Sequence, residues 1–164
     1  MDSNMTIPIE VLELENRSLG RDGEATLAAA YQMLKCEWDE GVREREVILH
    51  LLFLTWYGLC EPGHLTGFDE NSTQWAELEH VFNEVYSSIQ HTIDNDPEML
   101  YVVGLMAYLF PYLLGDEAVW SKRSEQYRLQ YRSLVPNGLD PAIFRGRGAY
   151  GDYFSGQAQV VNGY

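Results

Sequence analysis

The chain has 164 residues, of which 46% are hydrophobic and 13% aromatic, and its 25 acidic and 11 basic residues give a formal net charge of -14. This length suits one domain with a sizeable core, so we expect residues 1–164 to form a single domain, and the aromatic content excludes long-range disorder. A pI near 4.5 excludes general nucleic-acid binding, which needs a basic surface to displace counterions.

Residues 1–20 carry no clear pattern, and we treat them as an N-terminal arm. Apolar spacing then predicts a helix over 23–38 and a second over 42–59, whose second half is apolar almost all round and should be central. Residues 61–72 are expected to form a loop. A third helix begins at 72 or 73 and reaches about 93, with a stripe of inward-facing residues: Trp75, Leu78, Phe82, Val85 and Ile89.

The strongest local signal is Asp96-Pro97-Glu98, because Asp is a good N-cap, Pro fits the first helical position and Glu complements the positive helix start. It predicts a helix over 97–114 that Pro111 kinks or ends. A fifth helix follows over 117–134, with four residues facing inward: Trp120, Tyr127, Tyr131 and Leu134.

The C-terminal part begins with a short turn over 141–144, which repeats the Asp-Pro start. The Gly-rich tail 145–164 is expected to be irregular, with its aromatic residues docked on the body of the protein. The sequence thus predicts an all-α fold of five to six antiparallel helices.

One helical hairpin resembles a known family. Residues 97–136 resemble a tetratricopeptide (TPR) unit through their Asp-Pro start, Gly104, tyrosines on both helices and the terminal Pro136, although the unit has 40 residues where the family uses 34. The resemblance implies a TPR-like stack of helical hairpins or a bundle. It does not extend to a peptide-binding function.

Targeting signals are not evident in the sequence. The start MDSNMTIPIEVLELE has neither a basic nor an apolar leader region, and the uncharged run 99–115 is too short for a membrane span. Cys36 and Cys60 form no metal or redox motif. We therefore expect a cytoplasmic protein without membrane contact.

A metal-binding enzyme is one alternative. Glu77 and His80 have the i, i+3 spacing of di-iron bundles, but a bundle needs two such motifs and more carboxylates, so an exposed pair is favoured. His50 lies in an apolar run with Glu46 four residues before it, which favours a hydrogen-bonded, partly buried histidine over a catalyst. We expect no cofactor and no bound metal.

The tail and the tyrosines each allow two interpretations. Arg145 and Arg147 are expected to clamp the tail through carboxylates, because two arginines on a chain of this charge make a weak RNA-binding segment. The pairs Tyr108/Tyr112 and Tyr127/Tyr131 predict either aromatic packing between two helices or a groove that recognises a partner.

Charge is distributed unevenly along the chain. Residues 1–98 hold 20 acidic and 5 basic residues, whereas residues 99–164 hold 5 and 6. If the first two helices meet near residue 40, Glu40 and Glu44 share a face with Glu37 one residue off, and these like charges repel. Such a cluster is either a solvated surface or a face that steers a cationic partner.

The absence of a nucleophile or phosphate-binding motif, together with the acidic surface, favours a protein-binding function. In general character the chain is similar to bacterial toxin-immunity proteins, which mask a basic partner. A TPR-like adaptor and a metal enzyme using Glu77, His80 and His50 are the alternatives. The residues expected to bind the partner are Glu37, Asp39, Glu40, Glu44, Asp69, Glu70, Glu77, Tyr108, Tyr112 and Tyr127.

Overall fold

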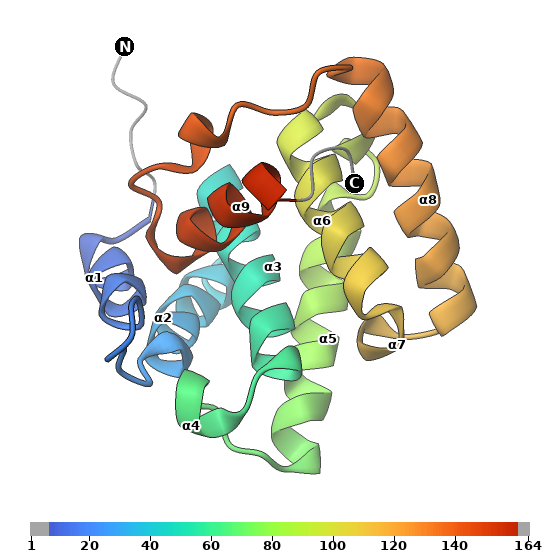
Figure 1. The fold of residues 1–164 in the computed structure, drawn as a ribbon. Coiled ribbons are helices and arrows are strands. Elements are labelled where there is room, and N and C mark those ends of the chain that lie inside the picture. The colour runs from blue at the N-terminus through green and yellow to red at the C-terminus, as the bar shows by residue number, and fades with distance from the viewer. Residues whose placement is uncertain (1–6, 161–164) are drawn as a thin grey trace.

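The structure is a computed structural model that describes residues 7–160, apart from the side chains of 159 and 160, and every regular element in this range is helical (Figure 1). The elements are α1 (Ile9–Arg17), α2 (Leu27–Asp39), α3 (Arg45–Cys60), α4 (Gly63–Thr66), α5 (Ser72–Ile89), the 3-10 helix η1 (Ile93–Asn95), α6 (Pro97–Leu109), α7 (Pro111–Leu114), α8 (Glu117–Leu134), the 3-10 helix η2 (Pro141–Phe144) and α9 (Gly148–Val160).

Two almost wholly apolar helices, α3 and α6, form the centre of the fold. Every α3 residue from Val47 to Trp56 is buried, and so is every α6 residue from Glu98 to Ala107. Helices α1 and α2 lie on one side of α3, α5 and α8 lie beyond it on the other, and α9 crosses α3 near its start (Figure 1). The apolar run over 99–109 is therefore a core helix, as the sequence predicts.

Side-chain caps start several of the helices where the sequence predicts them. The Asp96 carboxylate accepts a hydrogen bond from the Met99 N–H at 3.1 Å, and Asn71 and Asp116 cap α5 and α8 in the same way. The bounds of α8 and η2 agree with the predicted ranges. Pro111 ends the α6 helix, because Phe110 before it adopts φ -143° and ψ 68°, and the short α7 begins at the proline.

Three helices lie where the sequence predicts none. Helix α1 lies in the N-terminal arm, α4 lies in the loop over 61–72, and α9 replaces the irregular tail. In α9 the side chains of Tyr150 and Phe154 are fully buried one turn apart. Gly151 allows α9 to approach η2 closely, since a Cβ there would overlap the carbonyl oxygen of Phe144. Gly151 thus serves close packing between α9 and η2.

Two residues predicted to face inward are exposed. Trp75 is 47% exposed, because the first α5 side chain that enters the core is Leu78, which packs against Gly58 of α3. Leu134 is 40% exposed at the C-terminal end of α8. No helix in the described range combines the length and apolar character that a membrane crossing requires.

The hairpin over 97–136 forms two antiparallel helices, α6 and α8, which contact each other at Gly104. There the Ser124 hydroxyl donates to the Gly104 carbonyl oxygen at 3.1 Å, and three α6 residues earlier the Tyr101 ring lies 5.4 Å from that of Tyr131. A small residue on α8 faces the glycine, so the two helices approach closely at this point.

Enlarging the small residue at this approach should weaken the fold. We expect Ser124→Leu to lower the free energy of unfolding by about 1–3 kcal/mol, because the larger side chain overpacks the contact with Gly104. Ser121→Leu, on the exposed side of the same helix, should change it by less than about 0.5 kcal/mol. Urea unfolding measures both, and equal stability of the two variants would contradict a close approach at Gly104.

Candidate functional site

His50 lies at the centre of a cluster of buried charges. Its side chain is fully buried, and its Nδ1 lies 2.6 Å from Glu15 Oε2 of α1. Its Nε2 lies 3.4 Å from Glu46 Oε2, one turn earlier on α3, without hydrogen-bond geometry. A hydrogen-bonded histidine near Glu46 is as the sequence predicts, but the hydrogen bond is to Glu15 rather than to Glu46, and burial is complete rather than partial. Glu15, which is 35 residues away in the sequence, was not predicted.

The second oxygen of Glu15 lies at the start of α9. Its Oε1 accepts a hydrogen bond from the Tyr150 N–H at 3.1 Å, so a buried carboxylate complements the positive end of that helix. Gly148 makes room for this contact: its φ is +67°, and a Cβ there would lie 2.8 Å from Glu15 Oε1. One carboxylate therefore joins α1, α3 and α9.

Arg147 extends the cluster to α6. Its guanidinium group forms ion pairs with Glu46 of α3 and Glu98 of α6. Arg45 also lies 2.9 Å from Glu98 Oε2 and forms two hydrogen bonds of 2.9 Å with the Asp96 carboxylate. The predicted clamping of the tail by arginine and carboxylates is thus confirmed for Arg147, whereas Arg145 is exposed.

The cluster fixes the protonation of its members. Burial lowers the pKa of His50, but the charge and hydrogen bond of Glu15 and the nearby Glu46 carboxylate outweigh burial and raise it to about 9. Burial raises the pKa of Glu46, and the nearby His50 together with the hydrogen bonds and charge of Arg147 overcomes this and holds it at about 2. The buried Tyr150 hydroxyl has no hydrogen-bond partner among the described residues, and burial raises its pKa well above the ordinary value.

These groups are arranged for stability rather than for chemistry on a substrate. His50, Glu15 and Tyr150 are fully buried, so no solute reaches them in this conformation. Each charge is paired, which is the condition under which buried ions persist. We call His50, Glu15, Glu46, Glu98 and Arg147 the buried charge cluster.

Removing the shared cation of this cluster should be costly. Arg147→Met leaves Glu46 and Glu98 without their common partner, and we expect it to lower the free energy of unfolding by about 3–5 kcal/mol. Arg145→Met, two residues earlier and exposed, should change it by less than about 0.5 kcal/mol. Chemical unfolding at pH 7 gives both values, and a small loss for Arg147→Met would show that the cluster does not hold α9.

The cluster also predicts how stability depends on pH. The folded-state pKa of His50 lies above its ordinary 6.5, so its contribution is complete below pH 6.5 and is lost as the pH rises to about 9. The folded-state pKa of Glu46 lies below its ordinary 4.5, so its contribution is complete above pH 4.5 and is lost as the pH falls to about 2.

His50→Gln should therefore remove most of the alkaline decline. It should also reduce the acid decline from Glu46, part of which remains because Arg147 still lowers the pKa of that carboxyl. Unfolding free energies of both proteins measured from pH 2 to pH 9 test this expectation. Parallel curves between pH 6.5 and pH 9 would contradict the charged state of His50.

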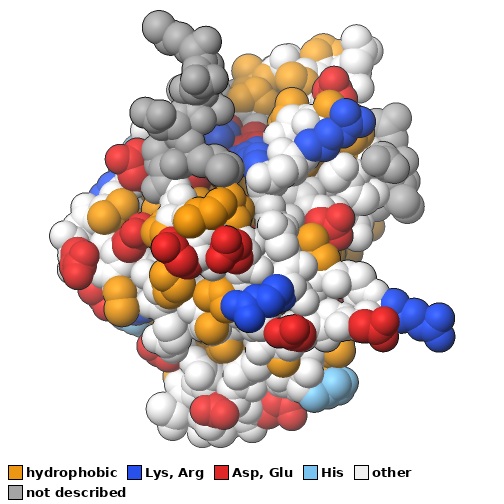
Figure 2. Space-filling model, turned by 90° about the vertical axis from the view of Figure 1, so that its left-hand side faces the viewer, with side chains coloured by type: hydrophobic (Ala, Val, Ile, Leu, Met, Phe, Trp, Pro, Cys, Tyr) orange, Lys and Arg blue, Asp and Glu red, His pale blue; other side chains and the backbone are white. Residues whose placement is uncertain are grey.

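The predicted acidic face near residue 40 is not continuous. Asp39 forms an ion pair of 2.6 Å with Lys35, Glu37 is half-buried, and Glu40 and Glu44 are exposed. Glu40 and Glu44 share no helical face, because α2 ends at Asp39 and Glu44 is the N-cap of α3. Arg43, which lies between them in the sequence, covers the Trp38 ring. Figure 2 shows acidic side chains interspersed with apolar and basic ones on the face that carries α1 and α2.

A second acidic set has no nearby basic residue in the sequence. The acids Asp69, Glu70, Glu77 and Glu79 are exposed and pair with no Lys or Arg of the described chain. Trp75, the exposed aromatic residue of the first α5 turn, lies between them in the sequence. We call these five residues the α5 acidic surface.

Helix α7 lies beside α5 (Figure 1). The Asn83 Nδ2, two turns after Trp75 on α5, donates to the Leu114 carbonyl oxygen of α7 at 2.8 Å. On this side of the fold Tyr108 is 62% exposed at the end of α6, and Tyr112 is 58% exposed in α7. Two of the predicted tyrosines therefore lie at the surface.

The other tyrosines form packing contacts. Tyr127 is 8% exposed and hydrogen-bonds the Tyr86 hydroxyl, and Tyr131 is buried against Tyr101. The four tyrosines thus do not line one groove, because the α8 pair faces the core. Of the two interpretations that the sequence allows for Tyr127, packing and partner recognition, its burial favours packing.

The residues of the metal-enzyme alternative are not brought together. His50 is buried, whereas His80 is exposed with its Nε2 3.4 Å from Glu84, and Glu77 accepts a hydrogen bond from Gln74. Residues 7–160 contain no group of three or more His, Cys, Asp or Glu side chains placed to hold a metal ion. Comparisons with protein-family models, curated proteins and solved structures found no match for the chain.

Proposed function

We propose that this chain is a non-enzymatic protein-binding protein that masks a basic partner in the cytoplasm, in the manner of an immunity protein. The observation that carries the proposal is the composition of the surface between Arg45 and Lys122. No Lys or Arg occurs between these two residues, yet this stretch exposes acids and large apolar side chains. The apolar ones are Leu65, Trp75, Tyr108, Tyr112 and Val119.

The buried charge cluster explains why the excess charge is at the surface. Glu46 and Glu98 belong to the same stretch, but they lie inside, where Arg147 returns from the far end of the chain to pair with both. No Lys or Arg among residues 7–160 forms an ion pair with the α5 acidic surface. Its carboxylates remain available to a cation from another molecule.

A surface of this kind suits recognition of a basic protein. Unpaired acids steer an oppositely charged partner and speed its association. Tyr and Trp then supply most of the affinity when they are buried, because they combine large contact area with few rotatable bonds. Trp75 is the central anchor in this proposal, with Tyr112 on the neighbouring α7.

A TPR-like adaptor is the second candidate, favoured by the close antiparallel packing of α6 and α8 at Gly104 and Ser124. It would bind an extended segment of a partner. The exposed tyrosines Tyr108 and Tyr112 suit either candidate.

Charge reversal on the α5 acidic surface tests the first candidate. In affinity capture from the source cell, a triple variant with Asp69→Lys, Glu70→Lys and Glu79→Lys should lose a basic protein that the unaltered chain retains. The matched control reverses three exposed acids elsewhere, Glu10→Lys, Glu13→Lys and Asp22→Lys, and has the same net charge. It should retain the partner.

Trp75→Ala should weaken capture of the same protein by at least about 30-fold if Trp75 is a hot spot, which corresponds to a loss of 2 kcal/mol. Equal losses in the two charge-reversed variants would attribute binding to net charge alone. Unchanged capture by the α5 variant and by Trp75→Ala would reject the proposed surface.

A further inference from the structure

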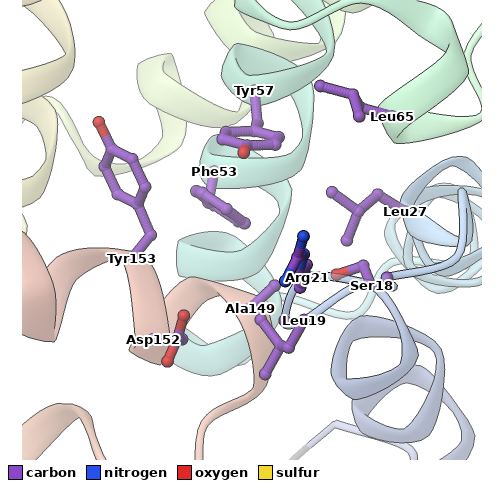
Figure 3. A pocket seen from close by; sticks show the side chains of 12 residues that line it. Ser18, Leu19, Arg21, Leu27, Phe53, Tyr57, Leu65, Ala149, Asp152 and Tyr153 are labelled. Atoms are coloured by element: carbon purple, nitrogen blue, oxygen red, sulfur yellow. The ribbon is translucent and has the colours of Figure 1, made fainter.

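A cavity of about 270 Å³ lies between the loop after α1, helix α3, helix α4 and the start of α9 (Figure 3). It is separate from the α5 acidic surface, and none of the residues predicted to bind a partner lines it. Ligand cavities in proteins span about 300–1,000 Å³. This cavity is close to the lower end of that range, so its volume restricts any ligand to a small molecule.

One wall of the cavity is aromatic. The Phe53 ring centroid lies 5.1 Å from that of Tyr57 and 5.8 Å from that of Tyr153. Phe53 is only 1% exposed, so it backs the wall, and the two tyrosines supply the accessible ring surface. Figure 3 shows Phe53 and Tyr57 between Tyr153 on one side and Leu27 on the other. Both tyrosines are half-buried. Such a wall favours a planar apolar group, which can pack face to edge or in an offset stack.

Two opposite charges border the same cavity. Arg21 lies in the loop that turns after α1 at Gly20, where φ is +85°, and Asp152 lies in the first half of α9. Both side chains are exposed, and neither forms an ion pair with a described residue. They lie on either side of Ala149 in Figure 3. The cavity thus offers a cation and an anion that the protein itself leaves unpaired.

These features select among ligand charges. A simple anion pairs with Arg21 but leaves Asp152 unpaired and is repelled by the net charge of -14. A simple cation pairs with Asp152 but leaves Arg21 unpaired. A zwitterion is neutral overall and can place its carboxylate near Arg21 and its ammonium group near Asp152. We propose that this cavity binds a free aromatic α-amino acid, with the aromatic side chain against Tyr57 and Tyr153.

Exposed ion pairs contribute about 0.2–1 kcal/mol each, so each charge should account for no more than about a fivefold change in affinity. The test uses L-phenylalanine and two analogues that lack one charge: 2-phenylethylamine has no carboxylate, and 3-phenylpropionate has no ammonium group. Isothermal titration calorimetry at pH 7 with millimolar ligand should show that L-phenylalanine binds more tightly than either analogue.

The variants assign each charge to its partner. Arg21→Ala should weaken L-phenylalanine about twofold to fivefold and abolish its advantage over 2-phenylethylamine. Asp152→Asn should weaken it to a similar extent and abolish its advantage over 3-phenylpropionate. Lys122→Ala and Glu125→Gln, two exposed charges of α8 that do not line the cavity, should leave all three affinities unchanged.

Thermal melting checks that each variant is folded, which the exposure of both side chains leads us to expect. Three results would overturn the proposal: no binding of L-phenylalanine, equal binding of the zwitterion and both analogues, or binding that neither Arg21→Ala nor Asp152→Asn changes. None of these results bears on the partner surface of α5.

Discussion

The pairing of Glu15, His50, Glu46, Glu98 and Arg147 is the interaction on which the rest of the structure depends. It joins the first helix, the two central helices and the last helix at one point inside the protein. We infer that these pairings help to fix how the helices pack against one another, because apolar cores tolerate other packings. Buried charges require their partners at defined positions, because an unpaired ion in the core is strongly destabilising.

Other features of the protein rest on this cluster. Helix α9 is held at its start by Glu15 and Arg147, and it supplies Ala149, Asp152 and Tyr153 to the cavity. The same pairings place the acids of the apolar helices inside and balance them there. The excess negative charge of the chain is therefore carried by exposed residues, and the α5 acidic surface is one part of it whose acids pair with no Lys or Arg of the described residues.

Local signals in the sequence predicted much of the fold. Local interactions, within one or two helical turns, determine the bounds of α8, the caps at Asp96 and Asn71 and the break at Pro111. Such interactions are evident from the sequence. Helix α9 was missed because its glycines were interpreted as flexible backbone. The i, i+4 pair Tyr150 and Phe154 was the signal that favoured a helix there.

The site was less predictable. His50 and Glu46 are one turn apart, so their pairing was foreseeable, whereas Arg147 and Glu46 are 101 residues apart and no local pattern links them. Trp75 was predicted to be buried because it belongs to an apolar helical stripe, but its side chain is exposed. Whether the end of a stripe is covered depends on where the neighbouring helix stops, and the periodicity of one helix does not contain that information.

The most direct measurement of the central claim is hydrogen–deuterium exchange of the protein alone and in complex with the basic partner that we propose. The account predicts slower exchange over α4, α5 and α7 in the complex, with the amides around Arg147 and Tyr150 unchanged because the buried charge cluster is structural. Protection confined to α8 and α9, or faster exchange around Tyr150 on binding, would contradict it.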